Sequence, residues 1–159
     1  MRKAKIKPQF DMWLNQNPQR DLIVTILVGH LTIEAMLVEL LQIKNHGETP
    51  WKWPFPKKVE RCRDYDFVTD DFMNALIQFN NLRNDYSHIL GHEITFNDAF
   101  TLIQYFASAK IDFSDDTIHL DKSKSEEWYG TEGVIIEILN NTFFELNTAI
   151  TTNGGSGHY

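Results

Sequence analysis

Apolar residues recur at helical spacing along most of this chain, and the longest such segment runs from residue 17 to about residue 44. Asn17 is a favourable N-cap for it, and Pro18 suits the first helical position. At about 1.5 Å per residue, this helix would be close to 40 Å long. Because it is apolar on nearly all sides, we expect it to lie at the centre of a helical bundle or to form half of a subunit interface.

The remaining periodic segments also predict helices. They cover residues 56–65, 69–88, 95–110 and 125–151. Their expected N-caps are Thr69 or Asp70, Thr95 or Asn97, and Ser125. Residues 111–125 alternate weakly, which predicts a loop or a small hairpin. The sequence therefore predicts one all-α domain over residues 1–152, a bundle of two long and about three shorter helices, with a flexible tail at 153–159.

Composition narrows the class of protein. The chain has 159 residues, a net charge of −7 and one cysteine, Cys62. A single cysteine cannot form an internal disulfide, and we find no apolar run approaching the roughly 20 residues of a membrane span. The basic N-terminus lacks the apolar core of a secretory signal. We therefore expect a cytoplasmic protein without membrane contact.

Charge is unevenly distributed along the chain. Residues 1–63 contain 11 of the 15 basic residues and 6 of the 22 acidic ones, whereas residues 64–159 contain the other 4 and 16. This asymmetry allows a local phosphate-binding patch on an acidic protein, although two ordinary solvated faces would look the same. The side chains expected to contact RNA, next to Trp51 and Trp53, are Lys57, Lys58, Arg61 and Arg63. The tryptophans themselves are better explained by packing.

The stretch "FNNLRNDYSH", residues 79–88, ends its helix with an unusual set of polar side chains. On a helical wheel Arg83 falls inside the apolar stripe, and His88 lies roughly 140° away from it. One continuous helix therefore does not aim both side chains at a single point. They converge only if the helix unwinds near His88 or if a second copy of the chain faces the first across a two-fold axis.

A buried arginine needs a partner, because an unpaired charge away from water is costly. Glu34 is the leading candidate, since it lies in the apolar stretch "LTIEAMLVEL". His30 precedes it by one helical turn, so the two can form a hydrogen bond. Tyr86 lies on the apolar stripe of the Arg83 helix, and we group it with Glu34 and His30 as a supporting residue. A purely structural Arg83–Glu34 ion pair explains the same residues equally well.

His88 also has a simpler explanation, which is that it caps carbonyls at the helix C-terminus. With His92 and Glu93 it suggests zinc, but the spacing is not that of a metalloprotease and Gly91 interrupts the turn. We therefore expect no metal and no cofactor. A helix-turn-helix with a basic recognition helix is also missing from the pattern, so we do not expect sequence-specific DNA binding.

The motif "LRNDYSH", with the upstream "FPKKVE" helix and the long helix that carries Glu34, resembles the HEPN superfamily of small helical domains. These domains carry an Arg, four to six residues and a His, often with Asn after the Arg. The continuation "EITFNDAF" is similar to the mannitol-repressor-like branch. The resemblance covers roughly residues 20 to 110 and implies a HEPN-like bundle that forms a two-fold dimer.

The resemblance also implies a function. Many active members are metal-independent endoribonucleases of toxin or defence type, which use the 2′-OH of RNA as the nucleophile. His88 would transfer a proton, Arg83 would bind phosphate oxygens, and Asn84 would orient the imidazole or bind phosphate. The alternative is a catalytically inactive, mannitol-repressor-like regulatory or scaffold dimer that acts through protein contacts. Expected partners are RNA, a second copy of the chain, and an antitoxin or regulatory protein.

Overall fold

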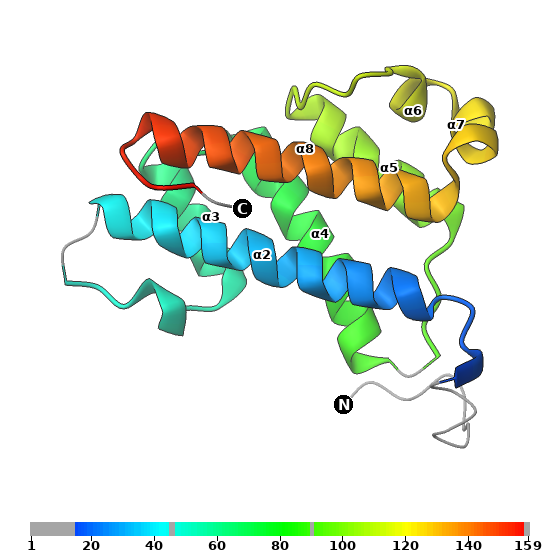
Figure 1. Cartoon of the computed structure of the whole chain (residues 1–159), viewed down its shortest axis with the longest axis horizontal. Helices are drawn as coiled ribbons and strands as arrows, with labels where there is room; N and C mark the ends of the chain where they lie inside the picture. The colour runs from blue at the N-terminus through cyan, green and yellow to red at the C-terminus, as the bar shows by residue number, and fades with distance from the viewer. Residues whose placement is uncertain (1–14, 45–46, 90, 158–159) are drawn as a thin grey trace.

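The computed structural model describes residues 15–44, 47–89 and 91–157, so residues 1–14 of the predicted domain lie outside the described residues. Within these ranges the chain is helical and contains no strand, which confirms the all-α class (Figure 1). In chain order, the elements are α2 (Arg20–Lys44), the 3₁₀ turn η1 (Pro50–Lys52), α3 (Phe55–Asp64), α4 (Asp70–His88), α5 (Phe96–Ser108), α6 (Thr117–Leu120), α7 (Lys122–Trp128) and α8 (Gly130–Thr152).

Side-chain caps fix the starts of two central helices as predicted. The hydroxyl oxygen of Thr69 accepts a hydrogen bond from the backbone N–H of Phe72 at the start of α4. Thr95 and Asp98 form a capping box at the start of α5. The expected first helical residue of α2, Pro18, is two residues early, because Asn17 caps a turn instead. Its Oδ1 accepts from the N–H of Gln19 at 2.9 Å, and the helix begins at Arg20.

The segment after α5 is a loop only as far as residue 116, so the predicted loop is too long, and no hairpin forms there. The rest of the segment contains α6 and α7, and Ser125 is a buried residue of α7 whose hydroxyl donates to the carbonyl of Ile118 at 2.7 Å. Ser125 is therefore not the cap of the last helix. That helix, α8, begins only at Gly130, whose φ of +64° breaks the continuity with α7.

The helix α2 lies in the body of the bundle. It packs against α3, α4 and α8, and α2 and α8 run side by side in the same direction (Figure 1). Gly29 lies at their contact, where a Cβ atom would come within 2.6 Å of the Leu139 side chain. The core side chains that α2 contributes are Leu22, Ile26, Ile33, Met36, Leu37, Leu40 and Leu41. These contacts place α2 in the body of the bundle, which is one of the two positions expected for it, and they do not test the other, a subunit interface.

One face of α2 nevertheless remains uncovered. Val24, Val28 and Leu31 expose 54%, 56% and 58% of their side chains. They are spaced by four and three residues, so they form one stripe along the helix, which we call the α2 stripe. Between this stripe and α8 lies a groove of about 350 Å³ that Val24, Val28, Ile136 and Phe143 help to line.

By length and composition α2 could also cross a membrane, with a mean hydropathy of 1.8 in its most apolar window. The expectation that no segment approaches the composition of a membrane span therefore does not hold for α2. Core helices of soluble proteins meet the same criterion, and the contacts of α2 with three other helices fit that explanation. A single helix of this kind is weak evidence for a membrane.

The part of the predicted tail that the structure describes folds back onto α2. The backbone N–H groups of Ser156 and Gly157 lie 3.0 and 3.4 Å from Oε1 of Glu39 and donate to it. Gly155 fits only because it lacks a side chain, since a Cβ there would come within 2.5 Å of Ile150. The glycines of this segment thus permit close packing against α2 and α8.

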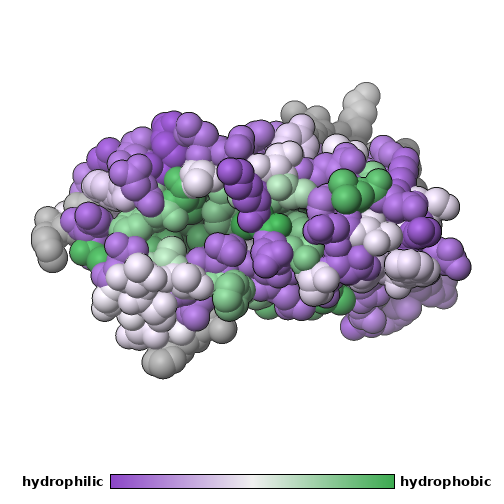
Figure 2. Space-filling model, turned by 90° about the horizontal axis from the view of Figure 1, so that it is seen from above, coloured by the Kyte–Doolittle hydropathy of each residue, from purple (hydrophilic) through white to green (hydrophobic). Residues whose placement is uncertain are grey.

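Seen from above, on the side where α8 and α5 lie in Figure 1, the molecule shows a band of apolar residues between rows of hydrophilic ones (Figure 2). Exposed apolar side chains of α8 include Ile136 and Phe144, of which Phe144 exposes 68%. Apolar surface is therefore not confined to the interior of this bundle, and α8 as well as α2 offers it to solvent.

Candidate functional site

The three predicted catalytic residues lie on the last turns of α4. The helix continues without interruption to His88, and the N–H of Ile89 still bonds to the carbonyl of Asp85 at 3.0 Å. Local unwinding therefore does not bring Arg83 and His88 together within one chain. On this regular helix their side chains point roughly 140° apart. Of the two ways in which they could converge, only the second copy remains.

Arg83 is half-buried and makes few contacts. Its Nη1 donates to Oδ1 of Asn84 at 3.0 Å, whereas its Nε is buried without an acceptor. Within the described ranges no carboxylate pairs with it, so the predicted Arg83–Glu34 ion pair is wrong. Asn84 is thus a partner of the guanidinium, and the arginine keeps most of its charge uncompensated.

Glu34 is instead paired with Lys58 of α3. Lys58 exposes only 2% of its side chain, and its Nζ donates to Glu34 and, at 2.7 Å, to the carbonyl of Trp53. The carboxylate itself exposes 27%. Lys58 is therefore a structural cation, and the prediction that it contacts RNA is wrong. The sequence could not show this, because 24 residues separate the two partners.

His30 is buried between aromatic rings and hydrogen-bonded to Asn80. Its Nε2 lies 2.9 Å from Oδ1 of Asn80, and its ring centroid lies 4.4 Å from that of Phe55. The predicted hydrogen bond to Glu34 is not formed. Burial lowers the pKa of His30, and the nearby Arg83 lowers it further, while the bond to Asn80 opposes them. The imidazole is therefore neutral at pH 7, and its Nδ1 has no partner among the described residues.

Asn80 is the residue that sequence reasoning missed. It is buried on α4 one turn before Arg83 and Asn84, and it links α4 to α2 through His30. A polar side chain at a buried helical position is the signal that would have identified it, because such groups need a partner. The helical wheel places Asn80 beside the apolar stripe, at the boundary of the buried face.

His88 differs from His30 in its exposure and in its hydrogen bonding. It is exposed at the last residue of α4, and no hydrogen bond or ion pair of its ring occurs in the part of the chain described. The ring does not cap a carbonyl, so the simplest structural explanation of this histidine is not supported. An imidazole in this position is accessible to a ligand.

Tyr86 has a structural partner. Its hydroxyl donates to Oε1 of Gln19 at 2.6 Å, and the N–H of Ile94 donates to the same oxygen at 2.9 Å. Burial raises the pKa of Tyr86 to about 12. These bonds tie the end of α4 and the segment after it to the start of α2. Tyr86 therefore supports the Arg83–His88 region by holding the backbone.

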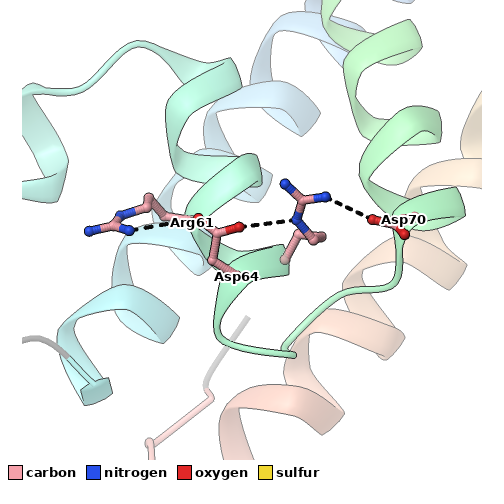
Figure 3. Close-up of polar contacts among 4 residues, drawn as sticks. Arg61, Asp64 and Asp70 are labelled. Carbon is pink, nitrogen blue, oxygen red and sulfur yellow. Dashed lines mark hydrogen bonds and ion pairs between the residues drawn. The ribbon is translucent and has the colours of Figure 1, made fainter.

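The other predicted RNA contacts are mostly neutralised. Arg61 lies 3.6 Å from carboxylate oxygens of Glu48 and Asp64, and Arg63 bridges Asp64 and Asp70 (Figure 3). Arg63 connects α3 to the start of α4, whereas Arg61 pairs with the segment before η1 and with α3 itself, and both arginines have carboxylate partners. Lys57 is exposed, with its ammonium 4.5 Å from the centroid of the Trp53 ring. Of the four predicted residues, Lys57 is the most available for phosphate.

Metal ligands do not gather in the described ranges, since no group of three His, Cys, Asp or Glu side chains could hold an ion there. Cys62 is buried, and burial raises its pKa to about 12, which keeps the thiol protonated and unreactive. Comparison of the chain with protein-family models, with curated proteins and with solved structures finds no match. The functional argument therefore rests on the residues themselves.

Proposed function

We propose that the chain is a metal-independent endoribonuclease of toxin or defence type that acts as a two-fold dimer in the cytoplasm. The 2′-OH of RNA attacks the adjacent phosphorus, the bond to the 5′-oxygen breaks, and a 2′,3′-cyclic phosphate and a 5′-OH form. His88 accepts the proton of the 2′-OH, and the His88 of the second copy donates a proton to the leaving 5′-oxygen. Arg83 binds the non-bridging phosphate oxygens, whose charge grows in the transition state.

One observation carries this proposal, namely the absence of a carboxylate partner for Arg83 in the described chain. An Arg83–Glu34 ion pair would have made this arginine structural. With Glu34 bonded to Lys58, the guanidinium of Arg83 keeps its charge, and Asn84 is the one side chain of the described residues that accepts a hydrogen bond from it. A half-buried cation of this kind favours an anionic ligand, and guanidinium binds phosphate in a bidentate manner.

The α2 stripe supports the dimer. On the helical wheel it lies about 100° around α2 from His30 and Glu34, the side on which Lys58 and Asn80 are bonded. The stripe is thus on a different face of α2 from these bonds, and we propose that a second copy covers the stripe and extends around α2 toward Arg83. A two-fold axis there would bring Arg83 of one copy and His88 of the other to one cleft.

Cleavage of mixed RNA in EDTA tests the proposal. The wild-type protein should cleave RNA to 2′,3′-cyclic phosphate ends and leave DNA intact, because DNA lacks the 2′-OH. Arg83→Ala and His88→Ala should reduce the rate by about 100-fold or more. Arg20→Ala, at an exposed arginine, and His119→Ala serve as matched controls and should retain activity. Failure of the wild type to cleave any RNA would refute the nuclease.

Light scattering tests the dimer separately. We expect the mass of two chains at micromolar concentration, and Leu31→Glu should shift it to that of one by placing a charge on the α2 stripe. Lys44→Glu at the end of the same helix is the control. A wild-type protein with the mass of one chain would rule out a cleft shared by two copies.

The second candidate is a catalytically inactive regulatory or scaffold dimer that binds an antitoxin or another regulatory protein. The α2 stripe favours it as much as it favours the nuclease, because apolar surface serves protein contacts with or without catalysis. The neutralised arginines of α3 also weaken the case for a broad RNA-binding surface. An intact dimer that cleaves no RNA would favour this candidate.

A further inference from the structure

A polar groove of about 240 Å³ lies between α4 and α5 on the side of α4 that carries His88. From α4 it is lined by Gln78, Asn81, Leu82 and Asp85, and from α5 by Thr101, Leu102 and Tyr105 among others. Pockets for drug-sized ligands are usually larger, at about 300 Å³ or more, so this groove fits a group the size of a single nucleobase.

Several polar groups of the groove are free to bind a ligand. The amides of Gln78 and Asn81 and the hydroxyls of Thr101 and Tyr105 have no hydrogen-bond partner among the residues that the structure describes. An amide presents a donor and an acceptor side by side, which matches the exposed edge of a base. The two amides of α4 and the two hydroxyls of α5 can together orient one flat ligand.

The charged side chains of the groove disfavour phosphate. Asp85 and Asp98 line it, and these two carboxylates outnumber the one imidazole there, that of His92. Oδ2 of Asp98 already accepts from the N–H and hydroxyl of Thr95 at 2.8 Å. Carboxylates repel phosphate oxygens but accept hydrogen bonds from amino groups. The ligand of this groove is therefore the base and not the backbone of a nucleic acid.

The groove also offers an aromatic ring and an apolar floor. Tyr105 exposes 37% of its surface, and Leu82 and the buried Leu102 lie beside it. Unpaired RNA bases are commonly bound by stacking on an aromatic side chain and by hydrogen bonds to their edges. Tyr105 can stack on the base while the amides of α4 bind its edge.

The position of the groove relates it to His88. Asn81 and His88 are seven residues apart, so they lie within about 20° of each other on α4 and about 10 Å apart along its axis. Asp85 lies between them, one turn before His88. A nucleotide whose base occupies the groove would thus have its phosphate close to His88. A pocket that selects the base next to the cleaved bond must lie at about this distance from the catalytic residue.

We propose that the α4–α5 groove is a base-specificity pocket that binds an unpaired purine of single-stranded RNA. The two-ring size of a purine suits stacking on Tyr105, and an Asn or Gln amide pairs in a bidentate manner with the N6 and N7 positions of adenine. The role in cleavage rests on the proposed ribonuclease function, whereas the binding of the purine does not.

Binding without cleavage tests the pocket. Fluorescence anisotropy of His88→Ala protein is measured in EDTA with labelled pentanucleotides that are all uridine or carry one central A, G or C. We expect the A or G oligonucleotide to bind about tenfold more tightly than all-uridine. Asn81→Ala and Tyr105→Leu should reduce this ratio to less than about twofold, and Tyr105→Phe should keep it because the ring remains.

Matched controls separate the groove from general effects. Asn74→Ala removes an exposed amide of α4 outside the groove, and Trp128→Leu removes an exposed aromatic ring of α7. Both should leave the purine preference unchanged. Equal binding of purine and pyrimidine oligonucleotides, no binding of either, or a preference that survives both groove substitutions would overturn the pocket.

The same measurements distinguish the two proposals. A wild-type protein that cleaves no RNA, while His88→Ala protein prefers purines through Asn81 and Tyr105, refutes the nuclease and supports the pocket. A wild-type protein that cleaves RNA with no preference for purines at the cut site, and binds without preference, supports the nuclease and overturns the pocket.

Discussion

Lys58 on α3 and Arg83 on α4 are both cations that lie beside polar residues of α2, but their surroundings are opposite. Lys58 is 2% exposed, pairs with Glu34 and donates to the carbonyl of Trp53. Arg83 is half-buried, bonds to Asn84 and leaves its Nε without an acceptor. The protein thus satisfies one cation fully and leaves the other available.

If Arg83 binds phosphate as proposed, the difference distinguishes a structural charge from a functional one. A buried charge is tolerated when its partners replace the water that it loses, and removing one partner then leaves the other unpaired. A cation without such partners costs stability in the free protein, and an anionic ligand recovers that cost when it binds. We therefore expect substitutions at Lys58 to change stability and substitutions at Arg83 to change activity.

The largest expected effect is on activity. Arg83→Met should lower the rate of RNA cleavage by about 100-fold to 1,000-fold, because the transition state loses its cation. The free energy of unfolding should change by less than about 1 kcal/mol, because no ion pair is broken. Single-turnover cleavage and urea unfolding of the same preparation give both numbers. A loss of stability that matches that of Lys58→Ala would make Arg83 structural.

Lys58→Ala should lower stability more than it lowers the rate of RNA cleavage. It leaves the Glu34 carboxylate and the Trp53 carbonyl without their donor, and we expect a loss of about 2–3 kcal/mol, below the value for a fully buried pair because Glu34 is 27% exposed. Lys57→Ala is the matched control, since Lys57 is exposed and should cost about 0.5 kcal/mol or less. Equal losses in the two variants would contradict the structural role of Lys58.

Replacing both Lys58 and Glu34 should lower the free energy of unfolding less than replacing either residue alone. The double variant Lys58→Met with Glu34→Leu leaves neither charge unpaired, and we expect it to lie within about 1 kcal/mol of the wild type. A double-mutant cycle in urea, with both single variants, measures the coupling between the two residues. Additive losses would show that the two charges act independently.

The smallest expected effect is a pH dependence from His30. Its pKa is held below the ordinary 6.5, chiefly by burial. As pH falls below about 6.5, the unfolded chain binds a proton that the folded chain does not, so the free energy of unfolding decreases with falling pH. His30→Gln should flatten this slope, measured by urea unfolding between about pH 7 and pH 5. The control His119→Gln should retain it, and parallel curves for wild type and His30→Gln would contradict the shift.

Arg83 sharpens this last comparison. The charge of Arg83 contributes to the low pKa of His30 in the folded chain. Arg83→Met should therefore raise this pKa and bring it closer to the pKa of the histidine in the unfolded chain. The slope between about pH 7 and pH 5 should therefore be shallower in Arg83→Met than in the wild type. An identical slope would show that the two residues are not coupled.

The candidate site was predictable only in part. Arg83, Asn84 and His88 could be selected from one stretch of sequence, and the wheel correctly separated Arg83 from His88, because α4 is regular to its last residue. The partners could not be selected in this way. His30 and Asn80 are 50 residues apart, and composition gives no rule for choosing Asn80 over Glu34.

The sequence by itself determined the helical class and the starts of α4 and α5, since Thr69 and Thr95 act within a few residues of themselves. Tertiary structure alone decided that Glu34 binds Lys58, that the segment before α8 forms two short helices, and that the glycine-rich end packs on Glu39. The physical reason is the distance along the sequence over which each interaction acts. Caps and periodicity are local interactions, whereas the choice of partner for a buried charge depends on which helices the common core brings together.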